Sequence, residues 1–268
     1  PVPENRAIEV YDMVSSSGPT QICRIPPNPD TGIVGIEDLA YFSPLSRYVV
    51  TWQPMERVKK GEGNLKIWDV RTGRLLVMWE HASRQGWPVL RWTPNERLLV
   101  RLFQGQLQVY NWHEFVNSDT VLKAPAPTTP EEAEAPILRD SSSLTREVLH
   151  DQQGFTEFSV THSAVAAFIP EKKGRPAKVM VFRLNDFSDV TTKHPKPKKQ
   201  QANAQQSTQP AQATQPTNQE NTAVPLIASQ EPVATKSFFK ADEVNMIWHS
   251  RGIGVLILAS TVQESSGK

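Results

Sequence analysis

Few side chains in this sequence are spaced for catalysis or metal binding. The six histidines are scattered, and no pair shows the four-residue helical spacing, with a nearby carboxylate cluster, that a metal site would use. The single cysteine, Cys23, allows no intrachain disulfide and no cysteine-based zinc site. The sequence contains neither a GxSxG nucleophile elbow nor a P-loop. We therefore predict no catalytic residue, no metal site and no cofactor, in a protein that is not an enzyme.

Basic residues in predicted loops form the remaining chemical pattern. One compact run covers residues 172–175, and a second covers residues 196–199 beside a tract rich in Gln, Thr, Ala and Pro. Lysine and arginine on flexible loops contact phosphates without reading a base sequence. The alternative is loop charge that only keeps the protein soluble, and composition alone favours it. The candidate nucleic-acid contacts are Lys172, Lys173, Arg175, Lys196, Lys198 and Lys199.

The overall composition gives no global electrostatic preference. The 268 residues include 29 Lys plus Arg and 28 Asp plus Glu, so the net charge is +1. The longest apolar runs, such as residues 254–259, are far shorter than the roughly 20 residues that span a bilayer. Glu4, Arg6 and Glu9 interrupt the apolar stretches at the start, so we expect no secretory signal. Because the chain begins at Pro1, we also expect a fragment or a processed product, in a soluble intracellular protein.

The element that recurs along the chain is a short strand that ends in a turn. Residues 8–12, 65–69 and 107–111 each read apolar, polar, apolar, aromatic and then Asp or Asn, and residues 179–182 are a looser copy. Alternation with period two, rich in β-branched and aromatic residues, predicts half-buried strands. The Asp or Asn that follows favours a turn, because its side chain bonds the backbone just beyond it.

A second recurring element precedes the first and contains a proline. Pro44 and Pro94 each follow one apolar strand and precede another, at a position where a ladder hydrogen bond is not needed. The combined unit has four strands over roughly 40–50 residues, which is typical of a β-propeller blade. The units are centred on 39–79, 89–122 and 155–190, with the tail of one before residue 26 and the start of another after residue 244. We therefore predict an all-β, WD40-like β-propeller, incomplete at about three and a half blades.

Two stretches fit no blade. Residues 124–147 are rich in Pro, Glu, Ala and Ser, and residues 194–235 begin with basic residues and continue as a low-complexity tract. Neither has enough apolar side chains to offset its ordering entropy. We predict two disordered loop insertions within one partial propeller domain, 1–268, and expect that their loss hardly changes the fold.

The segment 236–244, KSFFKADEV, resembles a hallmark stretch of the eukaryotic translation initiation factor 2A family. Further similar segments occur in the same order along the chain: Thr51–Pro54, Asn64–Leu65, Asp69–Gly73, Val179–Phe187, Met246, Trp248 and Val255–Thr261. The similarity covers most of residues 36–261 outside the two insertions. The insertions themselves depart from the compact family pattern.

The resemblance implies the N-terminal half of a large, nine-bladed propeller. It also implies a cytoplasmic protein that binds the small ribosomal subunit and promotes binding of initiator methionyl-tRNA without GTP, with mRNA and other initiation factors as further partners and no membrane. We expect the six basic loop residues to contact ribosomal RNA. The charged C-terminal tail that the family uses for RNA and partner contacts is not in this sequence.

Two other classes of protein stay open at this stage. One is a propeller scaffold for protein–protein contacts, similar to the propeller-bearing component of initiation factor 3, without a direct RNA role. That component carries an RNA-recognition domain ahead of its propeller, and the sequence shows no such motif. The other is a propeller hydrolase, which would need carboxylates or histidines clustered on the central channel.

Overall fold

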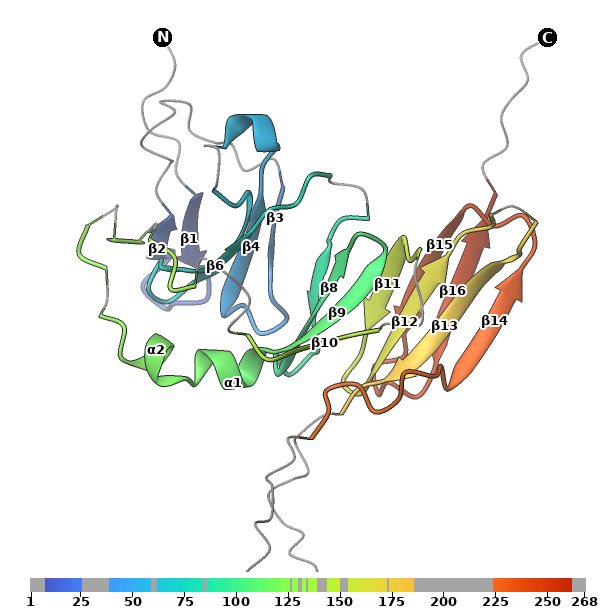
Figure 1. Cartoon of the computed structure of the whole chain (residues 1–268). Helices are drawn as coiled ribbons and strands as arrows, with labels where there is room; N and C mark the ends of the chain where they lie inside the picture. Colours follow the sequence, from blue (N-terminus) through green and yellow to red (C-terminus); the bar gives the residue numbers. More distant parts are fainter. Residues whose placement is uncertain are drawn as a thin grey trace, which may run out of the picture.

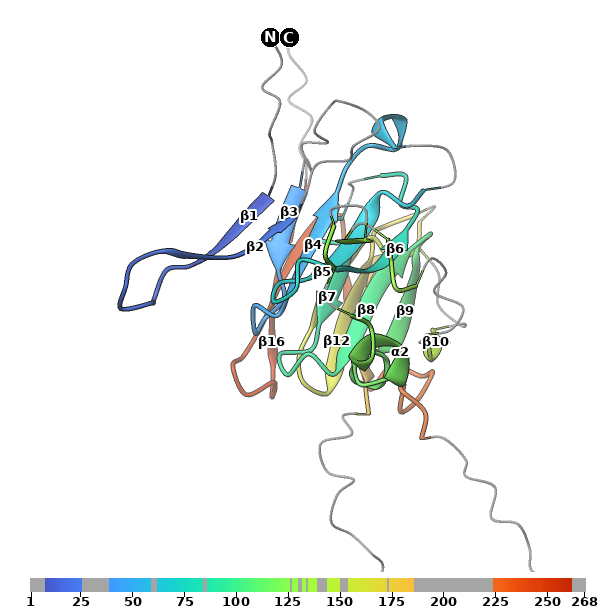
Figure 2. The ribbon, with the colours of Figure 1, turned by 90° about the vertical axis from the view of Figure 1, so that its left-hand side faces the viewer.

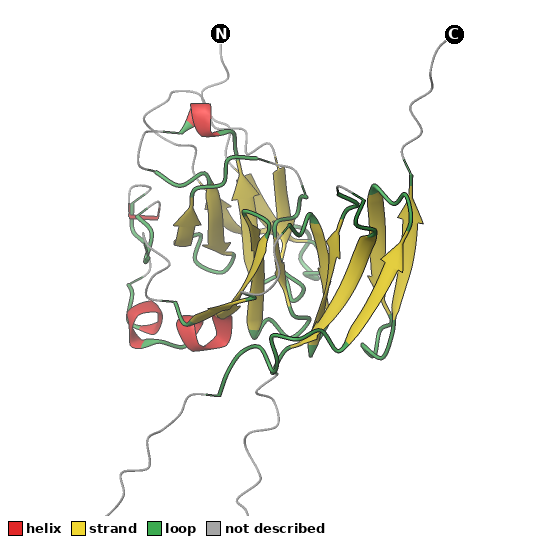
Figure 3. Ribbon diagram, turned by 45° about the vertical axis from the view of Figure 1, so that its right-hand side comes forward, coloured by secondary structure: helices red, strands yellow, loops and turns green. Residues whose placement is uncertain are grey.

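The computed structural model is all-β apart from a few short helices (Figures 1 and 3). It describes residues 8–25, 39–58, 62–83, 86–125, 127–129, 132–133, 135–138, 144–149, 154–172, 174–185 and 224–261. These residues form three four-stranded and two two-stranded antiparallel sheets. The prediction of an incomplete β-propeller is confirmed. No helix in this part of the chain is long and apolar enough to cross a membrane.

The first complete sheet, blade 1, has the predicted order and turns. Its strands, in spatial order, are β3 (Leu39–Phe42), β4 (Tyr48–Trp52), β5 (Leu65–Asp69) and β6 (Leu75–Trp79). The backbone N–H of Ser43 donates to the Tyr48 carbonyl across the turn that contains Pro44, at 2.9 Å. A 3-10 helix, η1 (Met55–Arg57), lies in the connection between β4 and β5.

Blades 2 and 3 each take their outer strand from beyond an insertion. Blade 2 consists of β7 (Leu90–Trp92), β8 (Leu98–Phe103), β9 (Gln106–Asn111) and β10 (Arg146–Val148), with α1 (Trp112–Val116) and α2 (Asp119–Leu122) between the last two. Blade 3 consists of β11 (Glu157–Val160), β12 (Ala164–Ile169), β13 (Ala177–Arg183) and β14 (Ala234–Phe238). The predicted units 89–122 and 155–190 therefore end too early, because each outer strand begins within the last residues of a predicted insertion.

Half-blades flank these three sheets. The hairpin of β1 (Ile8–Asp12) and β2 (Thr20–Ile25) packs beside blade 1, and its turn projects away from the sheets in Figure 2. The hairpin of β15 (Glu243–Trp248) and β16 (Val255–Ser260) packs beside blade 3. Both hairpins agree with the predicted partial units at the two ends.

The core is divided into clusters that lie between successive sheets. The largest joins blades 1 and 2 and includes Trp52, Trp92 and Trp112, whereas the next joins blades 2 and 3. Strand β4 is buried along its whole length because both of its faces meet a neighbouring sheet. Each blade is thus stabilised by its neighbours, as expected when a single sheet cannot bury its own apolar faces.

The described residues of the first predicted insertion, 124–147, differ from a disordered loop. The N–H groups of Ile137 and Leu138 donate to the carbonyls of Leu75 and Leu76, at 3.2 and 3.0 Å. Leu138 thereby forms a parallel bridge with β6, and Leu144 is buried in the cluster between blades 1 and 2. This segment covers the outer edge of blade 1, where free N–H and C=O groups would otherwise be exposed.

The second predicted insertion, 194–235, ends before its predicted C-terminal bound. Residues 194–223 lie outside the described residues, but Leu226 and Ile227 are buried and β14 begins at Ala234. The two ends of the tract are held together, because Leu184 pairs with Ile227 and the N–H of Asn185 donates to the Leu226 carbonyl at 2.9 Å. The tract therefore leaves and rejoins blade 3 at one place.

Candidate binding surface

The connections between strands gather on two opposite faces of the sheets. We call the side that carries η1 the η1 face, and the side that carries α1 and α2 the α1 face (top and bottom in Figure 1). Because the strands of each blade alternate in direction, the β6–β7, β8–β9, β10–β11, β12–β13 and β14–β15 connections lie on the η1 face. The β9–β10 and β13–β14 connections, which contain the two insertions, lie on the α1 face.

The structure describes two of the six predicted RNA contacts, Lys172 and Arg175. Lys172 and Arg175 are exposed in the β12–β13 connection, where their backbones exchange two hydrogen bonds of 3.2 and 3.0 Å. Lys173 lies outside the described residues, as do Lys196, Lys198 and Lys199. The tract that carries the last three leaves β13 on the α1 face, at the opposite end of that strand. Among the residues that the structure describes, Lys172 and Arg175 are therefore the predicted contacts that lie together.

Two further lysines lie beside this loop because of strand register. Ala177 pairs with Phe238 and Val179 pairs with Lys236, so the end of β14 runs along the start of β13. Lys236 and Lys240 are exposed, and the Lys240 N–H donates to the Glu171 carboxylate at 2.9 Å. We call Lys172, Arg175, Lys236 and Lys240 the blade 3 basic edge. The sequence shows Lys236 and Lys240 but not this grouping, because the pairing partner lies more than 50 residues away in the chain.

The described acidic groups only partly balance this edge. Glu171 and Asp242 are the exposed carboxylates in the two connections. Three of the four cations lie on these connections, whereas Lys236 lies on β14 and an exposed Glu243 begins β15. Four cations thus lie beside three anions, which leaves a small local positive surface on a chain of nearly zero net charge. Such a surface attracts phosphate groups through charge alone.

An ion pair that the sequence does not reveal joins the inner strands of blades 2 and 3. The Arg91 Nη2 atom lies 2.7 Å from Glu157 Oε1, and the same guanidinium donates to the Phe158 carbonyl. Burial raises the pKa of the Glu157 carboxyl, while the Arg91 charge opposes that rise. Arg91 and Glu157 are two isolated charges on different strands, so no spacing in the sequence indicates that they meet.

A cavity of about 330 Å³ opens on the η1 face between three connections. It lies among the β6–β7, β8–β9 and β10–β11 connections, and its lining residues are His81, Ala82, Ser83, Val89, Leu102, Phe103, Gln104, Gly105, Phe155 and Thr156. Burial, and to a lesser extent the Arg101 charge, lowers the pKa of His81 to about 4, so this ring is neutral at pH 7. None of the described residues that line the cavity is a carboxylate.

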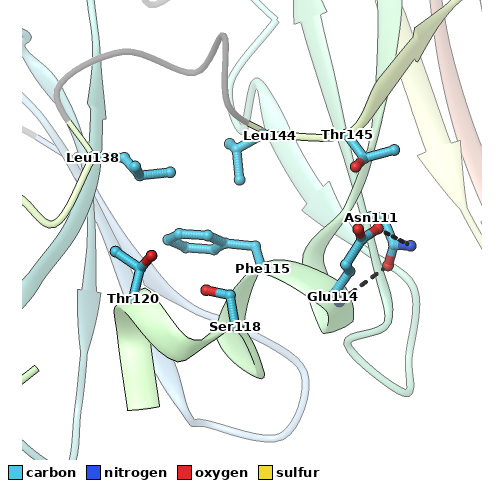
Figure 4. Close-up of a pocket in the computed structure, with 8 residues that line it drawn as sticks. All are labelled: Asn111, Glu114, Phe115, Ser118, Thr120, Leu138, Leu144 and Thr145. Carbon is cyan, nitrogen blue, oxygen red and sulfur yellow. Dashed lines mark hydrogen bonds between the residues drawn. The ribbon is translucent and has the colours of Figure 1, made fainter. Parts of the chain in front are cut away.

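A smaller pocket of about 150 Å³ lies on the α1 face, where the first insertion passes over α1 (Figure 4). Phe115, Leu138 and Leu144 point into it. At its edge, the Asn111 amide donates to Glu114 at 2.8 Å, and the Glu114 N–H donates to Asn111 Oδ1 at 3.1 Å. This reciprocal cap begins α1. Ligand pockets usually exceed about 300 Å³, so this space is better explained as a packing seam.

The part of the chain that the structure describes contains no group of three or more His, Cys, Asp or Glu side chains that could hold a metal ion. Cys23 is buried in β2, as its apolar surroundings predict, and burial raises the pKa of its thiol. A buried thiol with a raised pKa is a poor nucleophile.

Comparison with known proteins decides the family. A Drosophila melanogaster protein named eukaryotic translation initiation factor 2A is 49% identical over 231 residues, which cover 84% of this chain and 26% of that protein. A Schizosaccharomyces pombe protein of the same name is 25% identical over 232 residues, covering 85% of this chain and 28% of that protein. The chain belongs to the eukaryotic translation initiation factor 2A family. It spans about a quarter of the length of these initiation factor 2A relatives.

The chain is also similar to a component of another initiation factor and to a solved structure. A component of eukaryotic translation initiation factor 3 from Xenopus laevis is 24% identical over 153 residues, covering 57% of this chain and 19% of that protein. A crystal structure of a eukaryotic initiation factor superimposes with a TM-score of 0.55 at 21% identity, covering 95% of this chain and 45% of that chain. That likeness supports the propeller fold. No family model matches the sequence.

Proposed function

We propose that the chain is the non-catalytic propeller part of a translation initiation factor that acts in the cytoplasm. In this proposal it binds the small ribosomal subunit and promotes binding of initiator methionyl-tRNA without GTP, with mRNA and other initiation factors as further partners. The initiation factor 2A relatives support the general role. The blade 3 basic edge is the observation that carries the RNA contact, because exposed cations on adjoining connections suit a phosphate backbone.

Co-sedimentation of the full-length protein with small ribosomal subunits over a salt series tests this function. We expect binding that weakens steeply with salt, because each phosphate contact contributes about 0.7 to 0.9 to the logarithmic salt slope. Lys172→Glu with Arg175→Glu should weaken binding and make the salt slope shallower by the contribution of about one to two phosphate contacts. Wild-type protein that does not sediment with the subunits would contradict the proposal.

Two further variants separate the candidate residues. Lys196→Glu, Lys198→Glu and Lys199→Glu together test the run in the second insertion. Lys123→Glu is the matched control, because Lys123 is an exposed cation on the α1 face that pairs with Asp119, at 2.6 Å. We expect the control to bind like the wild type. A filter-binding measurement with initiator methionyl-tRNA, with and without GTP, then checks the tRNA step.

A protein-only scaffold is the second candidate function. The similarity to a component of initiation factor 3 over 57% of the chain favours it. In that case, binding to the small ribosomal particle should persist at high salt and be unaffected by charge reversal at Lys172 and Arg175. The salt series therefore discriminates the two functions.

A further inference from the structure

The cavity on the η1 face has walls that are fixed before any ligand arrives. The β6–β7 wall is held by Asn64, which accepts from the His81 N–H and donates to the His81 carbonyl, both at 2.7 Å. The Asn64 side chain is fully buried, and the Trp52 indole also donates to the His81 carbonyl at 3.0 Å. A binding wall held in this way needs little ordering when a ligand binds.

The other two walls are joined to each other. The N–H groups of Gly154 and Phe155 both donate to the Gly105 carbonyl, at 2.9 and 3.0 Å. Gln104 and Gly105 both have positive φ, as a two-residue hairpin turn of type I′ requires, and this turn places Phe103 at the cavity. At Gly86 an added Cβ would lie 2.9 Å from the Thr156 carbonyl, so the first and third walls also approach closely.

A buried guanidinium lies behind the aromatic wall. The Arg101 guanidinium carbon is 4.3 Å from the centroid of the Phe103 ring and 5.2 Å from that of Trp79. Arg101 is 4% exposed, and its Nη2 donates to the Glu80 carbonyl at 2.9 Å. Among the residues that the structure describes, no carboxylate forms an ion pair with it. The cation holds the Phe103 ring in place and gives this wall a positive field.

The lining chemistry fits a flat ring with polar edges. Val89, Leu102 and Phe155 provide apolar surface, and Phe103 provides a half-buried aromatic ring. Ser83, Gln104 and Thr156 add polar side chains, and His81 adds a neutral ring whose Nδ1 atom is buried. A nucleobase presents an apolar face for stacking and hydrogen-bonding groups around its edge.

We propose that this cavity binds one unpaired nucleobase of single-stranded RNA, stacked on Phe103. The proposal rests on the proposed function, which brings the protein to RNA, but it concerns a different surface from the blade 3 basic edge. The cavity lies at the η1-face ends of blades 1, 2 and 3, whereas the blade 3 basic edge lies on the outer part of blade 3. The basic edge would bind phosphates, and the cavity would hold one base.

The test uses the full-length protein and a single-stranded oligoribonucleotide that contains one 2-aminopurine, whose fluorescence changes on stacking. We expect binding with a fluorescence change for the wild type, and roughly a 5- to 150-fold weaker Kd for Phe103→Leu, from the usual contribution of one stacked base. Phe103→Tyr keeps the ring and should restore binding. Phe239→Leu is the matched control, because Phe239 is 86% exposed in the β14–β15 connection on the same face but outside the cavity.

Three results would overturn the proposal. The first is that the wild type causes no change in 2-aminopurine fluorescence. The second is that Phe103→Leu binds the oligoribonucleotide as tightly as the wild type. The third is that Phe103→Leu and Phe239→Leu lose the same amount of affinity. Equal affinity for the RNA together with loss of a protein partner in Phe103→Leu would assign the cavity to an aromatic side chain of that partner. A melting curve of each variant checks that it is folded. If Phe103→Leu does not fold, the comparison of Phe103→Tyr with the wild type still tests whether an aromatic ring at this position supports binding.

Competition identifies the source of the base and separates this proposal from the function above. Small ribosomal subunits, initiator tRNA or an unstructured mRNA fragment are each added to displace the oligoribonucleotide, and the strongest competitor names the source. If the wild type sediments with the ribosomal particles but Phe103→Leu binds the probe normally, only the cavity proposal fails. If the probe depends on Phe103 but the wild type does not sediment with them, only the proposed function fails.

Discussion

At the scale of single residues, Arg91 and Glu157 show how one charge pair connects two blades. Their side chains are only 25% and 26% exposed, so each would be left partly desolvated without the other. The Arg91 guanidinium also lies 4.8 Å from the centroid of the Phe158 ring. Its side chain therefore contacts the inner strand of blade 3 through a carboxylate, a carbonyl and a ring.

Replacing Arg91 should cost more stability at neutral than at acidic pH. Burial raises the folded-state pKa of the Glu157 carboxyl above its ordinary value of 4.5. The protonated carboxyl therefore favours the folded state at low pH, and this contribution to the free energy of unfolding is lost as the pH rises through the raised pKa. Arg91→Met removes the charge that opposes this rise, and the folded-state pKa moves further up. We expect a loss of about 1–3 kcal/mol at pH 7 and a smaller loss at pH 4, where Glu157 is largely protonated.

Urea denaturation at the two pH values measures this difference. Arg175→Met is the control, because Arg175 is exposed in a loop and its removal should change the free energy of unfolding by less than about 0.5 kcal/mol. Equal losses at pH 4 and pH 7 for Arg91→Met would show that the pair with Glu157 does not matter.

Gly63 is required by a close approach of the backbone. A Cβ at this position would lie 2.7 Å from both the backbone N and the carbonyl O of Trp79, so β6 would have to move. We expect Gly63→Ala to reduce the free energy of unfolding by about 1–3 kcal/mol, as overpacking does. Gly254→Ala, where an added Cβ meets nothing within 4 Å, should be neutral, and equal melting temperatures for the two variants would refute this explanation.

At the scale of elements, the two insertions should respond differently to deletion. The ends of the second tract are held by the Leu184–Ile227 pairing and by Asn185, whose side chain donates to the Pro225 carbonyl at 2.6 Å. Deleting 187–223 with a short Gly-Ser linker should leave the free energy of unfolding unchanged or raise it by up to about 1–2 kcal/mol, because loop closure becomes cheaper.

Deleting 126–143 is the contrasting experiment. That segment contributes buried Ala133 and the pairing of Leu138 along β6, so its loss should destabilise blade 1 by several kcal/mol. Chemical denaturation of both deletions gives the comparison. Loss of cooperative unfolding in the 187–223 deletion would contradict the expectation that this tract does not stabilise the fold.

The strands that sequence analysis identified are those with a strong local pattern. Residues 8–12 and 65–69 form β1 and β5 with the predicted bounds, and Pro44 and Pro94 lie in the predicted turns. Strands β10 and β14 were missed as parts of blades 2 and 3. Their sequences, REV and ATKSF, are exposed or half-buried and carry no clear apolar alternation. Their positions depend on hydrogen bonds to β9 and β13, which lie across long insertions.

At the scale of the whole molecule, one flank of the described sheets is an open apolar surface. Ile247 is directly opposite Leu256 in the β15–β16 hairpin, and Leu258 lies two residues further along. These side chains are 55%, 67% and 67% exposed, respectively. Contiguous apolar surface of this kind promotes association.

We expect the isolated 268-residue chain to associate and to be poorly soluble. Leu256→Thr with Leu258→Thr should increase the monomer fraction in size-exclusion chromatography with light scattering, because it removes apolar area while introducing β-branched side chains, which suit a strand. Leu122→Thr is the control, since Leu122 is 65% exposed but lies on α2, away from this flank. A monodisperse wild-type chain would contradict the expectation.

The sequence by itself determined the strands with a strong local pattern, their repetition as blades and the family resemblance, because alternation and turn residues are properties of neighbouring positions. Only the tertiary structure decided which strand completes each blade, that Lys236 and Lys240 join Lys172 and Arg175, and that three connections enclose a cavity beside Phe103. These features depend on register between segments tens of residues apart, which is set by inter-strand hydrogen bonds and by packing against the next blade.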